Sequence, residues 1–253
     1  MTSVGEQCRW PRPHASRVAL AVEPRLVPLF KRSFPQLEVY PLDMSLPVDR
    51  FEAQIALGSL GRFLRRRLSD FPPTGPHLLK ADEAQSQDLR RKVGEGKRRI
   101  CGLSWRSKNE KVGRVRSVSL EALLPILSLP DITWVDLQYD DTRAERTALA
   151  AEYGLNLRKL DEIDNFRDID GLAALIDACD LVVTIDNTTA HLAAALGKPT
   201  WILLPHVPDF RWLMGRNDSP WYPTVRLFRQ PGIGDWPGVI TNVREALQRL
   251  PET

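Results

Sequence analysis

The run Leu181-Val-Val-Thr-Ile-Asp-Asn-Thr-Thr-Ala-His-Leu-Ala-Ala-Ala-Leu-Gly197 carries the clearest structural signal in this chain. Its first five residues are apolar or β-branched, which is typical of a strand buried on both faces of a sheet. Asp186 and Asn187 are good helix caps, and the alanine-rich residues after them predict a helix that Gly197 ends. A buried strand that leads directly into a helix is the repeating unit of parallel α/β sheets.

The same alternation extends to both sides of this run. Short apolar segments predict further strands at 99–105, 132–138, 155–157, 199–204 and 225–228. Periodic or capped segments predict helices at 82–93, 119–127, 142–153, 169–179 and 236–250. Because strands that alternate with helices form parallel sheets with right-handed crossovers, we expect residues from about 80 onward to form a doubly wound, Rossmann-like domain.

The segment before residue 71 predicts a smaller α/β unit. Strands are expected at 17–22, 37–40 and 53–57, and helices after Pro24 and over 60–68. Phe71-Pro-Pro-Thr-Gly-Pro76 follows, and its three prolines and one glycine exclude a continued helix or a central strand. We therefore predict a shortened amino-terminal α/β domain at 1–78 and a complete larger domain at 79–253.

Composition excludes several classes of protein. The chain has 253 residues, of which 43% are hydrophobic and 26% charged, so dominant disorder is excluded. It shows neither an apolar run near the ~20 residues of a membrane span nor a secretory leader. The net charge of +3 is too small to indicate nucleic-acid binding. Cys8, Cys101 and Cys179 form no pair or metal motif, which favours a reducing cytoplasm, with Cys101 and Cys179 as buried apolar side chains.

Ligands of parallel sheets bind beyond the carboxyl ends of the strands, so the loops there are the places to search. Asp186, Asn187, Thr188 and Thr189 follow the most hydrophobic strand and begin a helix, where free backbone N–H groups attract anions. His191 lies one turn further on. Two interpretations stay open: a site for two phosphates of a nucleotide, or a helix cap with a histidine in the core.

Three further loops follow predicted strands. The first runs from Ser104 to Ser117 and is rich in basic residues, which predicts either a phosphate clamp or a solvated loop. The second, 138–141, is expected to be a structural turn. The third, 204–223, is long and dense in aromatic residues and prolines, which is typical of a functional loop or of a packed surface loop.

Several sequence motifs of cofactor and metal sites are missing from the chain. It has no GxGxxG, P-loop, GxSxG or zincin motif. The histidines are far apart and lack ligand spacing: His14, His77, His191 and His206. We therefore expect neither a metal site nor a bound cofactor.

Several of these segments together resemble a known family. They are Ile100-Cys-Gly-Leu-Ser-Trp-Arg106, Arg116-Ser117, Leu137-Gln138, the run 181–197, Pro208-Asp-Phe-Arg-Trp212 and Ser219-Pro-Trp-Tyr-Pro223. They resemble the glycosyltransferase-like domain found behind tetratricopeptide repeats in many bacteria. That domain is similar to ADP-heptose:lipopolysaccharide heptosyltransferases and, more distantly, to O-linked N-acetylglucosamine transferases.

The resemblance implies a GT-B fold, in which two Rossmann-like domains face each other and the carboxyl-terminal one holds a nucleotide sugar. Residues 186–189 and His191 would lie at the diphosphate. Arg106 and Arg116 would neutralise the phosphate charge. Trp105 and Gln138 would border the nucleotide, and Asp209 and Arg211 would face the sugar. The helix dipole and cationic side chains would replace a metal.

The amino terminus departs from the family pattern. Family members carry a Glu-Gln-Gly-x-Gly-Asp segment whose acid is a candidate general base. Here Gly5-Glu-Gln7 is followed by Cys-Arg-Trp-Pro-Arg-Pro13, and only Glu6 and Glu23 are candidates to replace the acid. The segment before residue 79 is also too short for a second full Rossmann-like domain, which is commonly ~150 residues.

These observations lead to two hypotheses. The first is a cytoplasmic, metal-independent, inverting glycosyltransferase that moves a sugar from an ADP- or UDP-linked donor to a glycan, lipid or protein hydroxyl. The alternative is a catalytically impaired module that binds nucleotide sugars. Neither hypothesis needs nucleic acid or a transmembrane segment. The sequence leaves open whether the protein contacts a membrane peripherally, which residue is catalytic and what the oligomeric state is.

Overall fold

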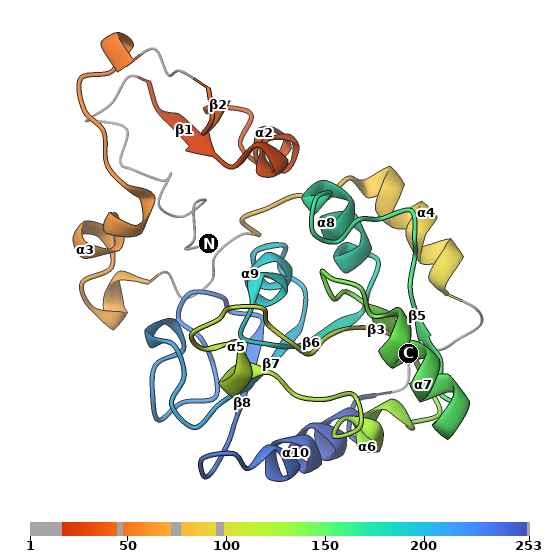
Figure 1. The fold of residues 1–253 in the computed structure, drawn as a ribbon. Coiled ribbons are helices and arrows are strands. Elements are labelled where there is room, and N and C mark those ends of the chain that lie inside the picture. Colours follow the sequence, from red (N-terminus) through yellow and green to blue (C-terminus); the bar gives the residue numbers. More distant parts are fainter. Residues whose placement is uncertain (1–16, 45–47, 72–76, 95–98, 252–253) are drawn as a thin grey trace.

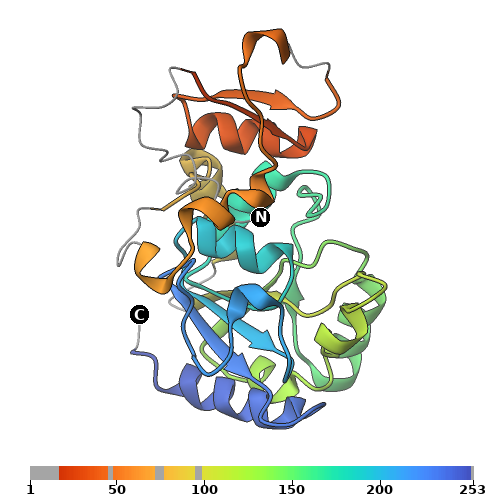
Figure 2. The same ribbon diagram turned by 90° about the vertical axis from the view of Figure 1, so that its left-hand side faces the viewer.

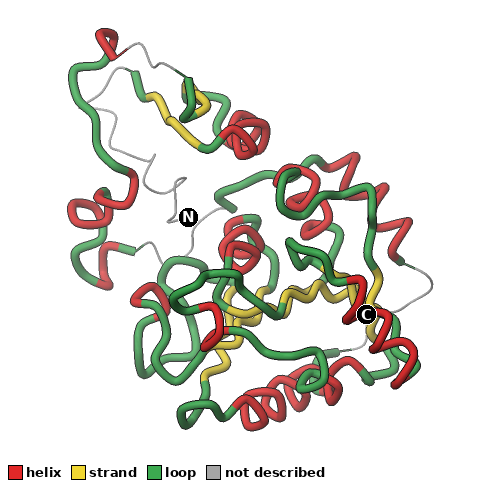
Figure 3. The backbone as a smooth tube through the Cα atoms, in the orientation of Figure 1, coloured by secondary structure: helices red, strands yellow, loops and turns green. Residues whose placement is uncertain are grey.

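The computed structural model describes residues 17–44, 48–71, 77–94 and 99–251. Within them the chain forms a six-stranded sheet flanked by helices and a two-stranded sheet beside the helix α2 (Val27–Ser33) (Figure 1). The backbone trace separates a small amino-terminal unit from the larger body that contains the six-stranded sheet (Figure 3). The proline-rich segment 72–76, on which the predicted linker falls, lies outside the described residues.

All strands of the large sheet are parallel, and their order is β5-β4-β3-β6-β7-β8. Their bounds are β3 Arg99–Ser104, β4 Ile132–Asp136, β5 Leu157–Arg158, β6 Leu181–Ile185, β7 Thr200–Leu204 and β8 Val225–Arg229. The chain moves outward from β3 to β5, returns beside β3 with β6 and then continues the other way. This is the doubly wound Rossmann order, and its direction reverses between β3 and β6. The predicted Rossmann-like domain is therefore confirmed.

Helices cover both faces of this sheet. Their bounds are α4 Glu83–Val93, α5 Gly113–Arg116, α6 Leu124–Leu127, α7 Arg143–Tyr153, α8 Ile169–Asp177, α9 Thr188–Ala195 and α10 Trp236–Gln248. One apolar cluster contains buried side chains of α4, α8 and α9, and a second contains those of α6, α7 and α10. Strand side chains alternate between the clusters, as Ile202 and Leu203 do, because successive residues of a strand point to opposite faces.

One predicted helix is shorter than expected. The segment 119–127 forms a regular helix only over α6, after a series of turns. Pro125 explains the difference, because proline lacks an N–H and is tolerated in the first turn of a helix but not in its interior. Ser119 still accepts a hydrogen bond from the Ala122 N–H, at 3.2 Å, and so caps the preceding turn.

The amino-terminal unit is a parallel pair of strands joined by a helix. It consists of β1 Ala19–Val22, a 3₁₀ turn at Pro24–Leu26, α2 Val27–Ser33 and β2 Glu38–Pro41. The predicted strand at 53–57 was wrong: residues 52–56 are exposed and pair with nothing in the described chain. The predicted helix 60–68 is reduced to α3 Gly61–Leu64, because the Asp70 carboxylate draws the N–H groups of Arg66 and Arg67 into a separate turn.

The small unit is attached to the larger body through α8 (Figure 2). The guanidinium of Arg32 donates two hydrogen bonds of 2.6 Å to the Asp170 carboxylate. Beside this pair, the Ser33 hydroxyl accepts the N–H of Lys80 at 2.9 Å, and Phe30 is buried in the same apolar cluster as α8. Parallel hydrogen bonds between arginine and a carboxylate fix orientation as well as distance.

Cys101 and Cys179 are both buried, as predicted, and burial raises the pKa of each thiol. Cys8 lies outside the described residues. None of the helices in the described part of the chain is long and apolar enough to cross a membrane.

Candidate functional site at the carboxyl edge of the sheet

The point where the strand order reverses is held together by one amide side chain. Asn187 caps α9, because its Oδ1 accepts the N–H of Ala190 at 3.2 Å. Its Nδ2 donates to the Ser104 hydroxyl at 2.8 Å, which joins the end of β6 to the end of β3. Thr188 is exposed in the first turn of α9, whereas Thr189 is 1% exposed. Only Thr188 of these two threonines therefore presents its hydroxyl to solvent.

Four charged side chains meet beside this helix start. Arg116 lies 3.0 Å from Asp186 and 3.6 Å from Asp209. Arg211 lies 2.7 Å from the other oxygen of Asp209. The structure thus brings together Arg116 from α5, Asp186 from the end of β6, and Asp209 and Arg211 from the loop after β7. The sequence pattern had placed these residues in three separate loops.

The two carboxylates of this group have different environments. Burial raises the pKa of Asp186, although Trp212 and Arg116 act in the opposite direction. Burial also acts on Asp209, but the hydrogen bonds and charge of Arg211 outweigh it, so the pKa of Asp209 is lowered. Asp186 is therefore the carboxylate that depends more strongly on Arg116 to remain ionised.

His191 lies one turn into α9 and is buried against two aromatic side chains. Its ring stacks on that of Trp212, with centroids 5.0 Å apart and planes at 17°, and its Nδ1 is 3.3 Å from the Tyr222 hydroxyl. Burial, reinforced by the nearby charge of Arg211, lowers its pKa to about 3. The imidazole is therefore neutral at physiological pH, and it can act on a ligand as a hydrogen-bonding group but not as a cation.

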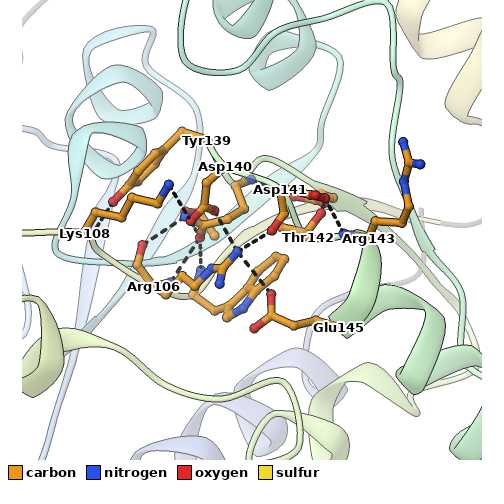
Figure 4. Close-up of polar contacts among 12 residues, drawn as sticks. Arg106, Lys108, Tyr139, Asp140, Asp141, Thr142, Arg143 and Glu145 are labelled. Atoms are coloured by element: carbon orange, nitrogen blue, oxygen red, sulfur yellow. Dashed lines mark hydrogen bonds and ion pairs between the residues drawn. The ribbon is translucent and has the colours of Figure 1, made fainter.

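Arg106 is turned toward acidic side chains of the β4–α7 loop. Its Nη2 lies 2.9 Å from Asp140 and 3.3 Å from Glu145, and it donates to the Asp141 carbonyl at 2.7 Å (Figure 4). Lys108 also approaches Asp140, at 3.4 Å. Arg106 thus faces carboxylates, as Arg116 and Arg211 also do, and its implied role in neutralising phosphate stays a prediction.

Gln138 and Trp105 are buried, and neither side chain borders open space. Gln138 is 0% exposed, and its Oε1 accepts hydrogen bonds of 3.1 Å from the Ser104 hydroxyl and from the N–H groups of Trp105 and Arg106. Trp105 is 1% exposed and belongs to an apolar core cluster. In this arrangement Gln138 holds the 104–106 backbone in place and Trp105 packs in the core beneath it, and the implied contact of these two residues with a nucleotide stays a prediction.

Sequence reasoning missed several residues of this region. The aromatic density of the loop 204–223 was a signal, but it did not identify Trp212 and Tyr222 as the side chains around His191. Asp140 and Glu145 were missed as partners of Arg106, because nothing in the sequence shows which loops become neighbours.

Comparison with known proteins agrees with this geometry. Residues 167–204, which span α8, β6, α9 and β7, match the model of glycosyltransferase family 9 (heptosyltransferase). The structure of E. coli ADP-heptose lps heptosyltransferase II superposes with a TM-score of 0.61 at 16% identity, over 98% of this chain and 95% of that one. This chain has a GT-B heptosyltransferase fold. The family resemblance carried by the 181–197 run is confirmed.

Two further proteins are similar to this chain. A glycosyl transferase family 9 structure from Veillonella parvula DSM 2008 matches with a TM-score of 0.50 at 14% identity, over 93% of this chain and 67% of that one. Protein FlbA of Caulobacter vibrioides is 33% identical in an alignment 248 residues long, which covers 91% of this chain and 41% of FlbA. The GT-B chain thus spans about two fifths of that relative. Its association with tetratricopeptide repeats stays a prediction.

Proposed function

We propose that this chain is a glycosyltransferase domain that binds the diphosphate of a nucleotide sugar at the start of α9 and transfers the sugar to an acceptor hydroxyl. The observation that carries the proposal is the position of residues 186–191. They lie inside the segment that matches glycosyltransferase family 9, and at the point of the sheet where the strand order reverses. Ligands of doubly wound sheets bind at such a point.

The local chemistry supports an anionic leaving group. The first N–H groups of a helix have no partner inside the helix and point outward, so the backbone of Thr188 and Thr189 offers donors to a phosphate. Arg116 and Arg211 bring two cations to the same place. Fixed donors and cations that face developing charge are commonly the largest contribution to catalysis of such a reaction. A metal ion is not needed for this role.

The proposed reaction is a displacement at the anomeric carbon of the donor. The acceptor oxygen forms a bond to this carbon while the bond to the phosphate oxygen breaks, and the nucleoside diphosphate leaves with the electron pair. The configuration of the carbon is inverted. The acceptor proton passes to a general base, for which the chain offers no assigned residue. The donor is an ADP- or UDP-sugar, and the acceptor is a glycan, lipid or protein hydroxyl reached in the cytoplasm.

One observation favours the alternative of a binding module without transfer. The acidic side chains beside α9, Asp186 and Asp209, are both paired with Arg116. Glu23, at the end of β1, lies 2.8 Å from Arg25, and Glu6 is outside the described residues. Each of these three described carboxylates already has a guanidinium partner, and Asp186 is also buried, so none of them stands free beside an acceptor hydroxyl.

Calorimetry and product analysis separate the two functions. The chain is titrated with ADP, UDP and their sugar conjugates, and release of the nucleoside diphosphate is followed with and without EDTA. We expect binding that Arg116→Ala weakens at least tenfold and that Arg244→Ala leaves unchanged, since Arg244 is exposed on α10, on the opposite face of the sheet. Binding without release would favour the module. No binding of any of these nucleotides would refute both functions.

A further inference from the structure

A second charged surface lies away from the candidate site, on the segment around α3. Arg62, Arg66 and Arg67 are exposed, and so are Phe63 and Leu68, whose exposed fractions are 62% and 60%. We call these five residues the arginine patch. Arg62 and Phe63 belong to α3, which is drawn apart from the six-stranded sheet (Figure 1). The arginine patch therefore combines three exposed cations with two exposed apolar side chains.

No acidic side chain in the described part of the chain forms an ion pair with the arginines of the patch. Residues 61–70 contain four arginines and one acid, Asp70, so this short segment alone carries a net charge equal to the +3 of the entire chain. Among the described residues, Arg62, Arg66 and Arg67 make no ion pair, and Asp70 accepts the backbone N–H groups of Arg66 and Arg67 at 2.7 and 2.8 Å. Arg32 and Arg116, by contrast, are each paired with a carboxylate.

The inner side of the segment is anchored to the larger body. The guanidinium of Arg65 lies over the ring of Phe71, 5.6 Å from its centroid. Phe71 in turn packs edge-on against Trp221, with centroids 4.7 Å apart and planes at 87°. Leu60, just before α3, is 8% exposed. These contacts hold the segment in one orientation, so the arginine patch is presented to solvent on a supported loop.

We propose that the arginine patch docks this protein on a membrane surface that contains anionic lipids. Guanidinium groups bind lipid phosphates by charge and by parallel hydrogen bonds, and exposed Phe and Leu side chains enter the boundary between headgroups and acyl chains. A nucleic acid would be bound by the same cations. Nucleic-acid binding would not, however, use the exposed Phe63 and Leu68 side chains that lie among these cations. We therefore favour a lipid surface over a nucleic acid.

Docking in this orientation has a consequence for the candidate site. Trp221, on which the segment is anchored, is followed by Tyr222, whose hydroxyl lies 3.3 Å from His191. The patch and the site are therefore joined by one loop, and membrane docking would bring the site near acceptors carried by lipids. The proposal itself does not rest on glycosyl transfer, because binding to vesicles needs neither donor nor turnover.

Vesicle sedimentation tests the proposal. The chain is mixed with vesicles of phosphatidylcholine alone, or of phosphatidylcholine with phosphatidylglycerol, and the bound fraction is measured at rising salt. We expect binding only to the anionic vesicles and release by salt. An arginine near an anionic surface contributes about fivefold in binding (~1 kcal/mol), so Arg62→Gln, Arg66→Gln and Arg67→Gln together should weaken binding about a hundredfold. Phe63→Ser with Leu68→Ser should weaken it at unchanged charge.

A matched control removes the same charge elsewhere. Lys31→Gln, Arg143→Gln and Arg244→Gln change three exposed cations outside the patch, and this triple variant should bind vesicles nearly as the parent does. Circular dichroism confirms that each variant is folded. The proposal is overturned if the parent does not bind anionic vesicles or if both triple variants lose binding equally. It is also overturned if the patch variants lose binding to a single-stranded oligonucleotide while no variant binds lipid.

Discussion

The guanidinium of Arg116 lies 3.0 Å from the carboxylate of Asp186, and this ion pair connects the short helix α5 to the end of β6. The Asp186 side chain is 4% exposed, whereas that of Arg116 is 19% exposed. The arginine therefore satisfies a buried charge while part of its own surface remains open to a ligand. A phosphate that arrives at the start of α9 would meet a cation already held in place.

The first prediction concerns the removal of this partner. Arg116→Ala removes the ion-pair partner of the buried Asp186 carboxylate and leaves only the more distant charge of Arg211, and loss of one partner from a buried pair costs about 3 kcal/mol of unfolding free energy. Burial already raises the pKa of Asp186, and loss of Arg116 raises it further. The destabilisation should therefore shrink as the pH falls through this pKa, because the buried carboxyl then takes up a proton.

Urea denaturation at neutral and at mildly acidic pH measures this effect. The control is Arg116→Ala combined with Asp186→Asn, which removes both charges and should recover part of the lost stability at neutral pH. A single variant that is as stable as the parent at both pH values would show that the pair does not hold the site together.

The second prediction concerns His191. Its pKa of about 3 lies below the ~6.5 of an unfolded histidine, so between these values the unfolded chain binds more protons than the folded one. This contribution to stability is complete above about pH 6.5 and is lost as the pH falls toward 3, with a slope of up to ~1.4 kcal/mol per pH unit. His191→Phe should flatten this part of the stability profile.

Trp212 offers a spectroscopic check on the same histidine. Trp212→Ala removes the ring that stacks on His191 and admits water, so the pKa of His191 should rise toward the ordinary value. Nuclear magnetic resonance of a histidine-labelled sample follows the titration directly. A His191 signal that titrates near its ordinary pKa in the parent chain would contradict the buried, neutral imidazole.

The third prediction concerns the hydrogen bonds by which Gln138 stabilises the loop after β3. Gln138→Ala removes the acceptor for the N–H groups of Trp105 and Arg106 and leaves buried donors unpaired, at about 1–3 kcal/mol each. Amide hydrogen exchange over 104–109 should accelerate, and nucleotide binding should weaken although Gln138 has no exposed surface. Thr147→Ala, at an exposed position of α7, is the control. If amide hydrogen exchange over 104–109 is unchanged in Gln138→Ala, then Gln138 does not stabilise this loop.

The fourth prediction concerns the junction of the two units. Arg32→Ala breaks both hydrogen bonds to Asp170, and since the two side chains are 30% and 20% exposed, the loss should be about 1–2 kcal/mol. Limited proteolysis should then release the segment before residue 77 sooner. The exchanged pair, Arg32→Asp with Asp170→Arg, should restore part of the resistance. Equal cleavage of all three proteins would mean that apolar packing alone joins the units.

Local signals predicted the large sheet well and the small unit less well. The strand at 181–185 coincides with β6, because five consecutive apolar or β-branched residues between polar ones leave little choice. The strand expected at 53–57, Ala-Gln-Ile-Ala-Leu, does not form, and this segment has only one β-branched residue where 181–185 has four. A short apolar run becomes a strand only where another strand pairs with it, and in the described chain no strand lies beside this one.

The same limit applies to the candidate site. The helix start at residues 186–189 follows from the local order of a strand, a cap and a helix, and the structure places it where expected. For His191, the sequence left open a phosphate contact or a place in the core, and the structure buries it, whereas nothing in the sequence indicated the partners of Arg106. Arg106 is neutralised by Asp140 and Glu145, and His191 is enclosed by aromatic side chains of a distant loop.

The sequence alone determined the alternation of strands and helices, and with it the edge of the sheet at which polar loops gather, since both follow from the periodicity of neighbouring residues. The tertiary structure decided which charges at that edge are already paired and which side chains are buried. Strand order brings Arg116 to Asp186 and Asp209, and Ser104 to Asn187. Ion pairing and burial depend on neighbours in space, and these are set only when the sheet assembles.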